Sequence, residues 1–134
     1  MQVIIMCGGH YDFFEQHKAL SVINGEPLIE RTIRLLKENN IENIYISSND
    51  DRFKEYGKIL KHENSYRFEN GIVNGYWVDA YYPTNEPTIY LHGDVYYTDD
   101  AIKKILNLNP SVNTFIGNQY ALNIEKKKEK SDER

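Results

Sequence analysis

Short apolar segments recur along the chain and predict β-strands. The clearest is Gln2 to Met6, a β-branched and apolar run that leads into Gly8-Gly9, the pattern of a central parallel strand buried on both faces. Apolar residues also predict strands over Ile41 to Ser47 and over Thr88 to Leu91, the latter just before His92-Gly93-Asp94. Weaker extended pieces are predicted at Ala19 to Ile23, closed by a turn at Asn24-Gly25, at Asn64 to Glu69 and at Thr114 to Ile116, and His10 to Lys18 is expected to be a loop.

Helical periodicity appears between these strands. Pro27 opens the clearest helix, whose apolar positions recur every three or four residues until Asn39-Asn40: Leu28, Ile29, Ile33, Leu35 and Leu36. A second helix is predicted from Asn49 or Asp50, which can cap it, to about Leu60, and a third from about Ile72 to Tyr82. Asp99-Asp100 are expected to cap a helix carrying Ala101, Ile102, Ile105 and Leu106.

Strands that alternate with helices imply a parallel sheet. Ligands of such sheets bind beyond the carboxyl ends of the strands, where the strand order reverses. Gly8-Gly9 and Gly93-Asp94 each follow a predicted strand. If these two strands are neighbours, both loops open onto one site.

Length and composition narrow the class of protein. The 134 residues suit one domain, and the net charge of −4 offers no basic face for duplex nucleic acid. A single cysteine excludes an internal disulfide framework. No apolar run is long enough to span a membrane or form a signal peptide, so we expect no membrane partner and a cytoplasmic location. The charged segment from Glu125 to Arg134 is expected to be a solvated tail after a domain of residues 1–124.

Three features are candidates for chemistry. Gly8-Gly9 either lets backbone amides approach phosphate oxygens or simply forms a tight turn. Lys18 either offers a positive charge to those phosphates or is an ordinary surface lysine. Asp94 either holds Mg²⁺ or is a turn residue; the capping role suits Asp99 and Asp100 better. The four histidines show no metal-binding spacing, and nothing indicates a Ser-His-Asp arrangement.

The order of several segments resembles the nucleoside-triphosphate transferase family, which includes sugar-1-phosphate nucleotidylyltransferases and molybdenum-cofactor guanylyltransferases. The segments are MCGG, HKAL, INGEPLIERTIRLLKENNIENIYI and TIYLHGDVYYTDDAI, which together reach nearly to Leu106. The resemblance implies an α/β fold of the glycosyltransferase-A-like (Rossmann-like) type, a three-layer sandwich with a mostly parallel central sheet.

The resemblance also implies an activity and its residues. The activity is Mg²⁺-dependent transfer of a nucleoside monophosphate from a triphosphate to a phosphorylated acceptor, with release of pyrophosphate. Lys18 and Asp94 would be catalytic, and Asp94 would bind the metal. The expected nucleotide-binding residues are Met6, Cys7, Gly8, Gly9, Lys18, Ser48, Asn49 and Asn70, the last placed ahead of a helix that begins near Gly71.

The sequence departs from the family pattern in two ways. The usual loop reads Gly-x-Gly-x-Arg, whereas here Gly8-Gly9-His10-Tyr11-Asp12 has no arginine before Lys18, and Asp12 and Glu15 add negative charge. Family members also continue into segments that build the acceptor pocket, so a fragment and a minimal form both stay open. Two alternatives therefore remain. One is a glycosyltransferase of the same fold, although Asp94-Val95-Tyr96 lacks the usual Asp-x-Asp pair; the other is a degenerate nucleotide-binding domain.

Overall fold

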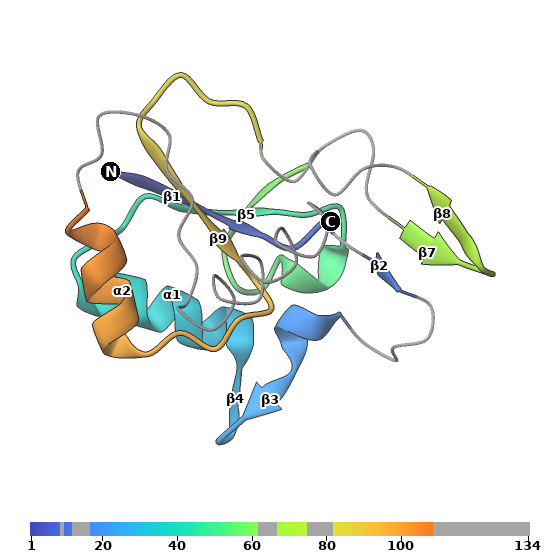
Figure 1. Ribbon diagram of the computed structural model, residues 1–134, viewed down its shortest axis with the longest axis horizontal. Coiled ribbons are helices and arrows are strands. Elements are labelled where there is room, and N and C mark those ends of the chain that lie inside the picture. Colours follow the sequence, from blue (N-terminus) through green and yellow to red (C-terminus); the bar gives the residue numbers. More distant parts are fainter. Residues whose placement is uncertain (9, 12–16, 62–66, 75–81, 109–134) are drawn as a thin grey trace, which may run out of the picture.

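A computed structural model of the chain describes residues 1–8, 10–11, 17–61, 67–74 and 82–108. Its centre is a sheet of 4 parallel strands in the order β6-β5-β1-β9 (Figure 1). These strands are β1 (Gln2–Met6), β5 (Ile44–Ser47), β6 (Lys58–Leu60) and β9 (Thr88–His92). The mostly parallel sheet with its helices confirms the expected α/β, Rossmann-like architecture, and the three predicted strands β1, β5 and β9 are all present.

One face of the central sheet carries the main hydrophobic core. Ile5 aligns with Ile46 of β5 and with Leu91 of β9, and aligned residues of parallel strands point to the same face. Helices α1 (Leu28–Glu38) and α2 (Asp99–Leu106) cover this face (Figure 1). The core cluster consists of Val3, Ile5, Cys7, Ala19, Ile29, Ile33, Leu35, Leu36, Ile44, Ile46, Phe53, Leu91 and Ile102. Within the described part of the chain, no α-helix covers the opposite face.

The helix α1 forms where its periodicity predicted it. Pro27 is its N-cap, in an extended conformation, so the missing N–H of proline costs no helical hydrogen bond. The buried stripe turns toward the sheet, and Ile29 is fully buried. The helix ends at Glu38, and Asn40 takes a φ of 66°, which stops further helical turns as expected for Asn39-Asn40.

The segment after β5 is not the helix that was predicted to follow a cap at Asn49 or Asp50. In place of a helix from Asn49 or Asp50 to about Leu60, a 3-10 turn η2 (Asp51–Phe53) is followed by β6. Gly57 lies in the middle of the predicted helix, where glycine costs helix stability. The free edge of β5 offers backbone hydrogen bonds to an extended chain, and Ile59 aligns there with Ile46. Strand pairing therefore replaces the predicted helix in this segment.

Two Asn-Gly turns build small hairpins outside the central sheet. Asn24-Gly25 joins β3 (Val22–Ile23) to β4 (Glu26–Pro27), and Asn70-Gly71 joins β7 (Arg67–Glu69) to β8 (Ile72–Asn74). All of these turn residues have positive φ, the requirement of a type I′ turn. The first hairpin confirms the predicted turn. Of the extended piece expected before it, only Val22–Ile23 is a strand, because residues 18–20 form a 3-10 turn.

The second hairpin and its pairing with β2 correct three further predictions. The helix expected over Ile72 to Tyr82 does not begin there, because β8 pairs with β7 in its place; residues 75–81 lie outside the described residues. Asn70 is consequently a turn residue and does not precede a helix. The strand β2 (His10–Tyr11) pairs in parallel with β7, so the predicted loop from His10 to Lys18 begins with a short strand.

The helix α2 has the predicted extent but a different cap. The hydroxyl of Thr98 accepts a hydrogen bond of 3.1 Å from the amide of Ala101, so Thr98 is the N-cap. Asp99 and Asp100 lie in the first turn, where negative charge favours the helix dipole, and do not cap it.

Two predictions concern parts of the chain outside the described residues, namely the strand Thr114 to Ile116 and the charged tail of residues 125–134. Among the helices that the structure describes, none has the length and apolar character needed to cross a membrane.

Candidate functional site

The strand order of the sheet reverses between β1 and β9. After β1 the chain adds β5 and then β6 on one side, and it returns to place β9 on the other side of β1. This is the topological switch point at which open α/β sheets bind ligands. Gly8 follows β1 and Asp94 follows β9, so the two predicted segments reach the same edge of the sheet from neighbouring strands.

The ends of β1 and β9 are in tight contact. The amide of Gly93 donates a hydrogen bond of 3.0 Å to the carbonyl oxygen of Met6. A Cβ atom at Gly93 would overlap the sulfur of Cys7 and lie 3.0 Å from that same carbonyl oxygen. Glycine is therefore required here by close packing. Directly beyond this contact, Asp94 is exposed to solvent and Gly8 is half-buried.

Cys7 lies beneath this edge and is nearly inaccessible, with 2% of its surface exposed. Burial raises the pKa of its thiol, and the nearby carboxylates of Asp94 and Asp50 raise it further. The thiol is thus neutral at physiological pH and is not a nucleophile. Its amide donates to the carbonyl oxygen of Ser47 at 2.8 Å, which extends the pairing of β1 with β5.

Lys18 is the first residue of the 3-10 turn η1 (Lys18–Leu20), which lies beside Gly93 through the side chain of Ala19. His17 caps this turn: its Nδ1 accepts a hydrogen bond of 3.1 Å from the amide of Ala19. The imidazole packs edge-on against Phe53, with 4.9 Å between ring centroids. The turn that presents Lys18 is therefore held by its neighbour His17 against the core.

His17 is a residue that sequence reasoning did not select. Its Nε2 is buried and has no hydrogen-bond partner among the described residues. Burial lowers its pKa, and the carboxylates of Asp50 and Asp94 act in the opposite direction. Metal-ligand spacing gave no signal for this histidine; its position immediately before Lys18 was the available clue.

The end of β5 contributes a polar turn. Ser48 is almost fully buried, and its hydroxyl accepts a hydrogen bond of 3.0 Å from the amide of Asp50. Asp50 caps η2 and forms an ion pair with Arg52, with 2.6 Å between Oδ2 and Nη2. The hydrogen bond from the Arg52 side chain is the main cause of the lowered pKa of Asp50. Asp50 was predicted as a cap, whereas Arg52 was not anticipated.

The predicted site residues fall into three groups. Those that the structure brings to the carboxyl edge come from the ends of β1, β5 and β9 and from η1: Met6, Cys7, Gly8, Lys18, Ser48, Asn49 and Asp94. Gly9 lies outside the described residues. Asn70 occupies the turn of the β7–β8 hairpin, which projects to one side of the central sheet (Figure 1).

The side chains at this edge suit Mg²⁺, a metal that does not require a complete set of protein ligands. Within the part of the chain that the structure describes, no group of three or more His, Cys, Asp and Glu residues is arranged to hold a metal. Mg²⁺ does not need one, because it keeps several waters and takes one or two carboxylates together with substrate phosphates. Asp94 is an exposed carboxylate of this kind, whereas Asp50 is already paired with Arg52.

Comparison of the sequence with known protein families agrees with the α/β fold described above. The sequence matches the MobA-like NTP transferase domain over residues 3–111, a range that includes the central sheet, apart from Gln2 of β1, and the described α-helices α1 and α2. A search of solved structures found no match. Because the matched range covers most of the chain, the chain belongs to the family of the MobA-like NTP transferase domain, a domain of the nucleotidyltransferases that act on nucleoside triphosphates.

Proposed function

We propose that the protein is a Mg²⁺-dependent nucleotidyltransferase that moves a nucleoside monophosphate from a nucleoside triphosphate to a phosphorylated acceptor. The acceptor is a sugar 1-phosphate or a similar small molecule, and pyrophosphate is released. The observation that carries this proposal is the pairing of β1 with β9, which sets the Gly8 turn beside Asp94 at the switch point of the sheet.

The proposed reaction needs positioning more than protein nucleophiles. A phosphate oxygen of the acceptor attacks the α-phosphorus, and the bond from this phosphorus to the bridging oxygen breaks, so that pyrophosphate leaves with the electron pair. Alignment and charge neutralisation supply most of the catalysis in such transfers. The neutral, buried thiol of Cys7 is consistent with a direct transfer that passes through no covalent enzyme intermediate.

Each residue of the edge has a role in this proposal. The backbone at Gly8-Gly9 approaches the phosphates closely, as glycine permits. Lys18 places a positive charge near the phosphate oxygens, and η1 holds it at the edge. Asp94 holds the metal through its exposed carboxylate. The metal, when bound, neutralises phosphate charge and favours departure of pyrophosphate.

The charges around the edge favour Asp94 over Asp50 as the metal carboxylate. The guanidinium of Arg52 makes three hydrogen bonds of 3.1 Å or less to the carboxylate of Asp50, through Nε and Nη2. Removing Asp50 from this pair would leave Arg52 without its partner. Asp94 has no comparable ion pair among the described residues, so its carboxylate can accept a metal at no such cost.

Calorimetry with the four common ribonucleoside triphosphates, with and without Mg²⁺, tests the binding step. We expect one triphosphate to bind in the presence of Mg²⁺, and Asp94→Asn to weaken this binding by about tenfold or more. Asp100→Asn is the matched control, because Asp100 is an exposed carboxylate on α2 and should leave affinity unchanged. Absence of binding for all four triphosphates would overturn the proposal.

Pyrophosphate release with a panel of sugar 1-phosphates tests the transfer step. We expect release that depends on both the triphosphate and one acceptor, and a large loss of release in Lys18→Met. Binding without turnover across the panel would identify a nucleotide-binding domain that has lost catalysis. Release of a nucleoside diphosphate from a nucleotide sugar would instead identify a glycosyltransferase.

A further inference from the structure

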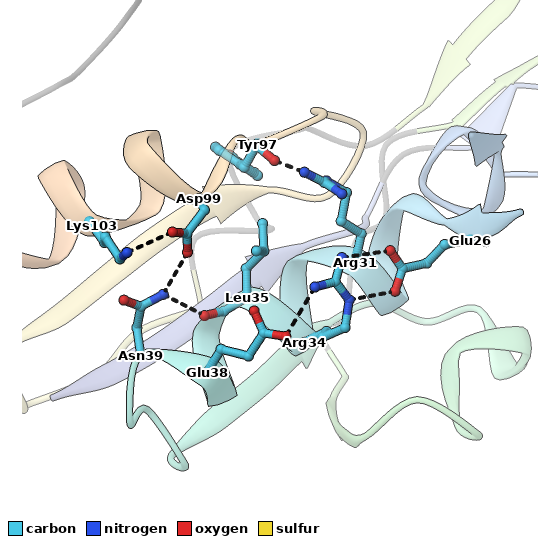
Figure 2. A network of polar contacts seen from close by, with 9 residues as sticks. All are labelled: Glu26, Arg31, Arg34, Leu35, Glu38, Asn39, Tyr97, Asp99 and Lys103. Atoms are coloured by element: carbon cyan, nitrogen blue, oxygen red, sulfur yellow. Dashed lines mark hydrogen bonds and ion pairs between the residues drawn. The ribbon is translucent and has the colours of Figure 1, made fainter. Parts of the chain in front are cut away.

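Arg31 links helix α1 to the loop that follows β9 (Figure 2). Its Nε donates a hydrogen bond of 3.0 Å to the backbone carbonyl oxygen of Tyr97. Its guanidinium carbon also lies 4.1 Å from the centre of the Tyr96 ring, a cation–π contact. One side chain thus contacts two successive residues of this loop, through a charge-assisted hydrogen bond and through ring stacking.

The loop in question carries Asp94 and is exposed as far as Tyr97. Tyr97 packs against the hydrophobic core, and its hydroxyl donates a hydrogen bond of 3.2 Å to the carbonyl oxygen of His92. Val95 is 37% exposed and Tyr96 is 40% exposed, and residues 95–98 have no regular secondary structure. At its start, the amide of Gly93 is bonded to the carbonyl oxygen of Met6. At its end, Tyr97 is held by Arg31. The segment that contains Asp94 is therefore fixed at both ends by contacts to other elements.

We infer that Arg31 is a positioning residue for Asp94. By holding the backbone at Tyr97, it fixes the path of residues 94–97 and so the place of the carboxylate at the edge of the sheet. This inference rests on the proposed role of Asp94 as the metal ligand. The physical reason is that metal and phosphate chemistry tolerates little error in placement, since a shift of about 1 Å can cost about a hundredfold in rate.

Arg34 offers a matched control on the same helix (Figure 2). It is an arginine whose guanidinium forms ion pairs with Glu26 at 2.8 Å and with Glu38 at 3.1 Å. Neither partner belongs to the loop after β9. A substitution of Arg34 therefore removes a guanidinium and its side-chain contacts from α1 and leaves the contacts of Arg31 to Tyr96 and Tyr97 in place.

Backbone order parameters measured by nuclear magnetic resonance test whether Arg31 holds residues 94–97 in place, an arrangement that we call the Arg31 clamp. In Arg31→Met, we expect the values for residues 94–97 to fall from those of an ordered loop toward about 0.6, while Arg34→Met leaves them unchanged. Arg31→Lys should behave like Arg31→Met, because lysine keeps the charge but lacks the planar group that bonds and stacks. Unchanged order parameters in both Arg31 variants would overturn the clamp, whatever the protein binds.

A Mg²⁺ titration of triphosphate binding then tests the positioning role. We expect both Arg31 variants to need at least about tenfold more Mg²⁺ for half-maximal binding, a loss that begins at the lower end of what one charge-assisted hydrogen bond contributes. Arg34→Met should match the wild type. Loss of loop order with an unchanged Mg²⁺ requirement would overturn the positioning role. A wild-type protein that binds no triphosphate would overturn the proposed function and with it this role, while the order parameters still decide on the clamp.

Discussion

The amide of Gly93 donates to the carbonyl oxygen of Met6 across 3.0 Å, and this bond closes the junction between β9 and β1. The two strands come from distant parts of the sequence, yet their last residues meet so closely that a side chain at Gly93 would overlap the sulfur of Cys7. The candidate site lies directly beyond this junction. Its geometry therefore depends on the packing of Gly93 against the backbone of Met6 and the buried side chain of Cys7.

Gly93→Ala should destabilise the protein by about 1–3 kcal/mol, because the new methyl group overpacks the junction. Chemical denaturation measures this loss. Gly57→Ala is the control: a Cβ atom there would meet only Cδ1 of Ile46, at an ordinary 3.7 Å. Adding Cys7→Ala to Gly93→Ala should recover part of the loss, since the sulfur is the closest obstacle. If the losses of unfolding free energy in Gly93→Ala and Cys7→Ala simply add in the double variant, the sulfur of Cys7 is not the atom that opposes the new methyl group.

His17 should make stability depend on pH in a definite direction. Burial lowers its pKa in the folded state below the ordinary value of 6.5, so the folded protein favours the neutral imidazole. The stability that this provides is complete above pH 6.5 and is lost as the pH falls below 6.5 toward the folded-state pKa. Protonation also removes the acceptor at Nδ1 on which the amide of Ala19 depends.

The comparison variant is His17→Asn, whose side-chain oxygen can still cap η1 but does not titrate. Unfolding free energies measured from pH 7.5 to pH 5 should fall more steeply for the wild type than for this variant. Equal slopes for the two proteins would show that the imidazole of His17 is not held in its neutral form by the fold.

Cys7 should resist thiol reagents in the folded protein. Its pKa is raised by burial and by the carboxylates of Asp94 and Asp50, so little thiolate exists near neutral pH. Modification by a coloured disulfide reagent should be slower by about three orders of magnitude in the native state than in guanidinium, and should follow the opening of the fold. Because the chain has one cysteine, the signal has a single source. Rapid modification of the native protein would contradict the packing beneath the site.

Thr98→Ala should cost about 1 kcal/mol of stability, because the amide of Ala101 loses its cap. Thr98→Ser keeps a hydroxyl in the same place and should stay close to the wild type. Thermal unfolding of both variants provides the measurement. If Thr98→Ala unfolds at the wild-type temperature, the first turn of α2 does not depend on this cap.

Local sequence signals predicted the central elements well. The apolar runs at β1 and β9 and the periodicity of α1 are each strong enough to resist tertiary influence, and glycine or asparagine marks their ends. The prediction of a helix failed for the segment that forms η2 and β6. The free edge of β5 determines the conformation of this segment, and no local sequence pattern indicates such an edge. The Asn70-Gly71 pair did carry a readable hairpin signal, which the helical spacing after it obscured.

The candidate site was predictable only where it follows a strand. Gly8 and Asp94 stand at strand ends, and parallel strands bring their carboxyl ends to one edge, so their proximity required only that β1 and β9 be neighbours. The places of His17 and Arg52 depend on how two 3-10 turns pack on the core around Phe53. That packing is a property of the assembled fold, and the residue types alone do not indicate it.

The late arrival of β9 in the chain has a consequence for how the molecule acquires its site during folding. β1 can pair with β5, and β5 with β6, as soon as those segments exist, whereas the pairing of β1 with β9 joins the two ends of the sheet-forming sequence. Contacts between such distant segments form slowly, because a long loop must close first. We therefore expect the glycine turn and Asp94 to come together in one of the last assembly steps, so that recovery of ligand affinity during refolding would time the docking of β9.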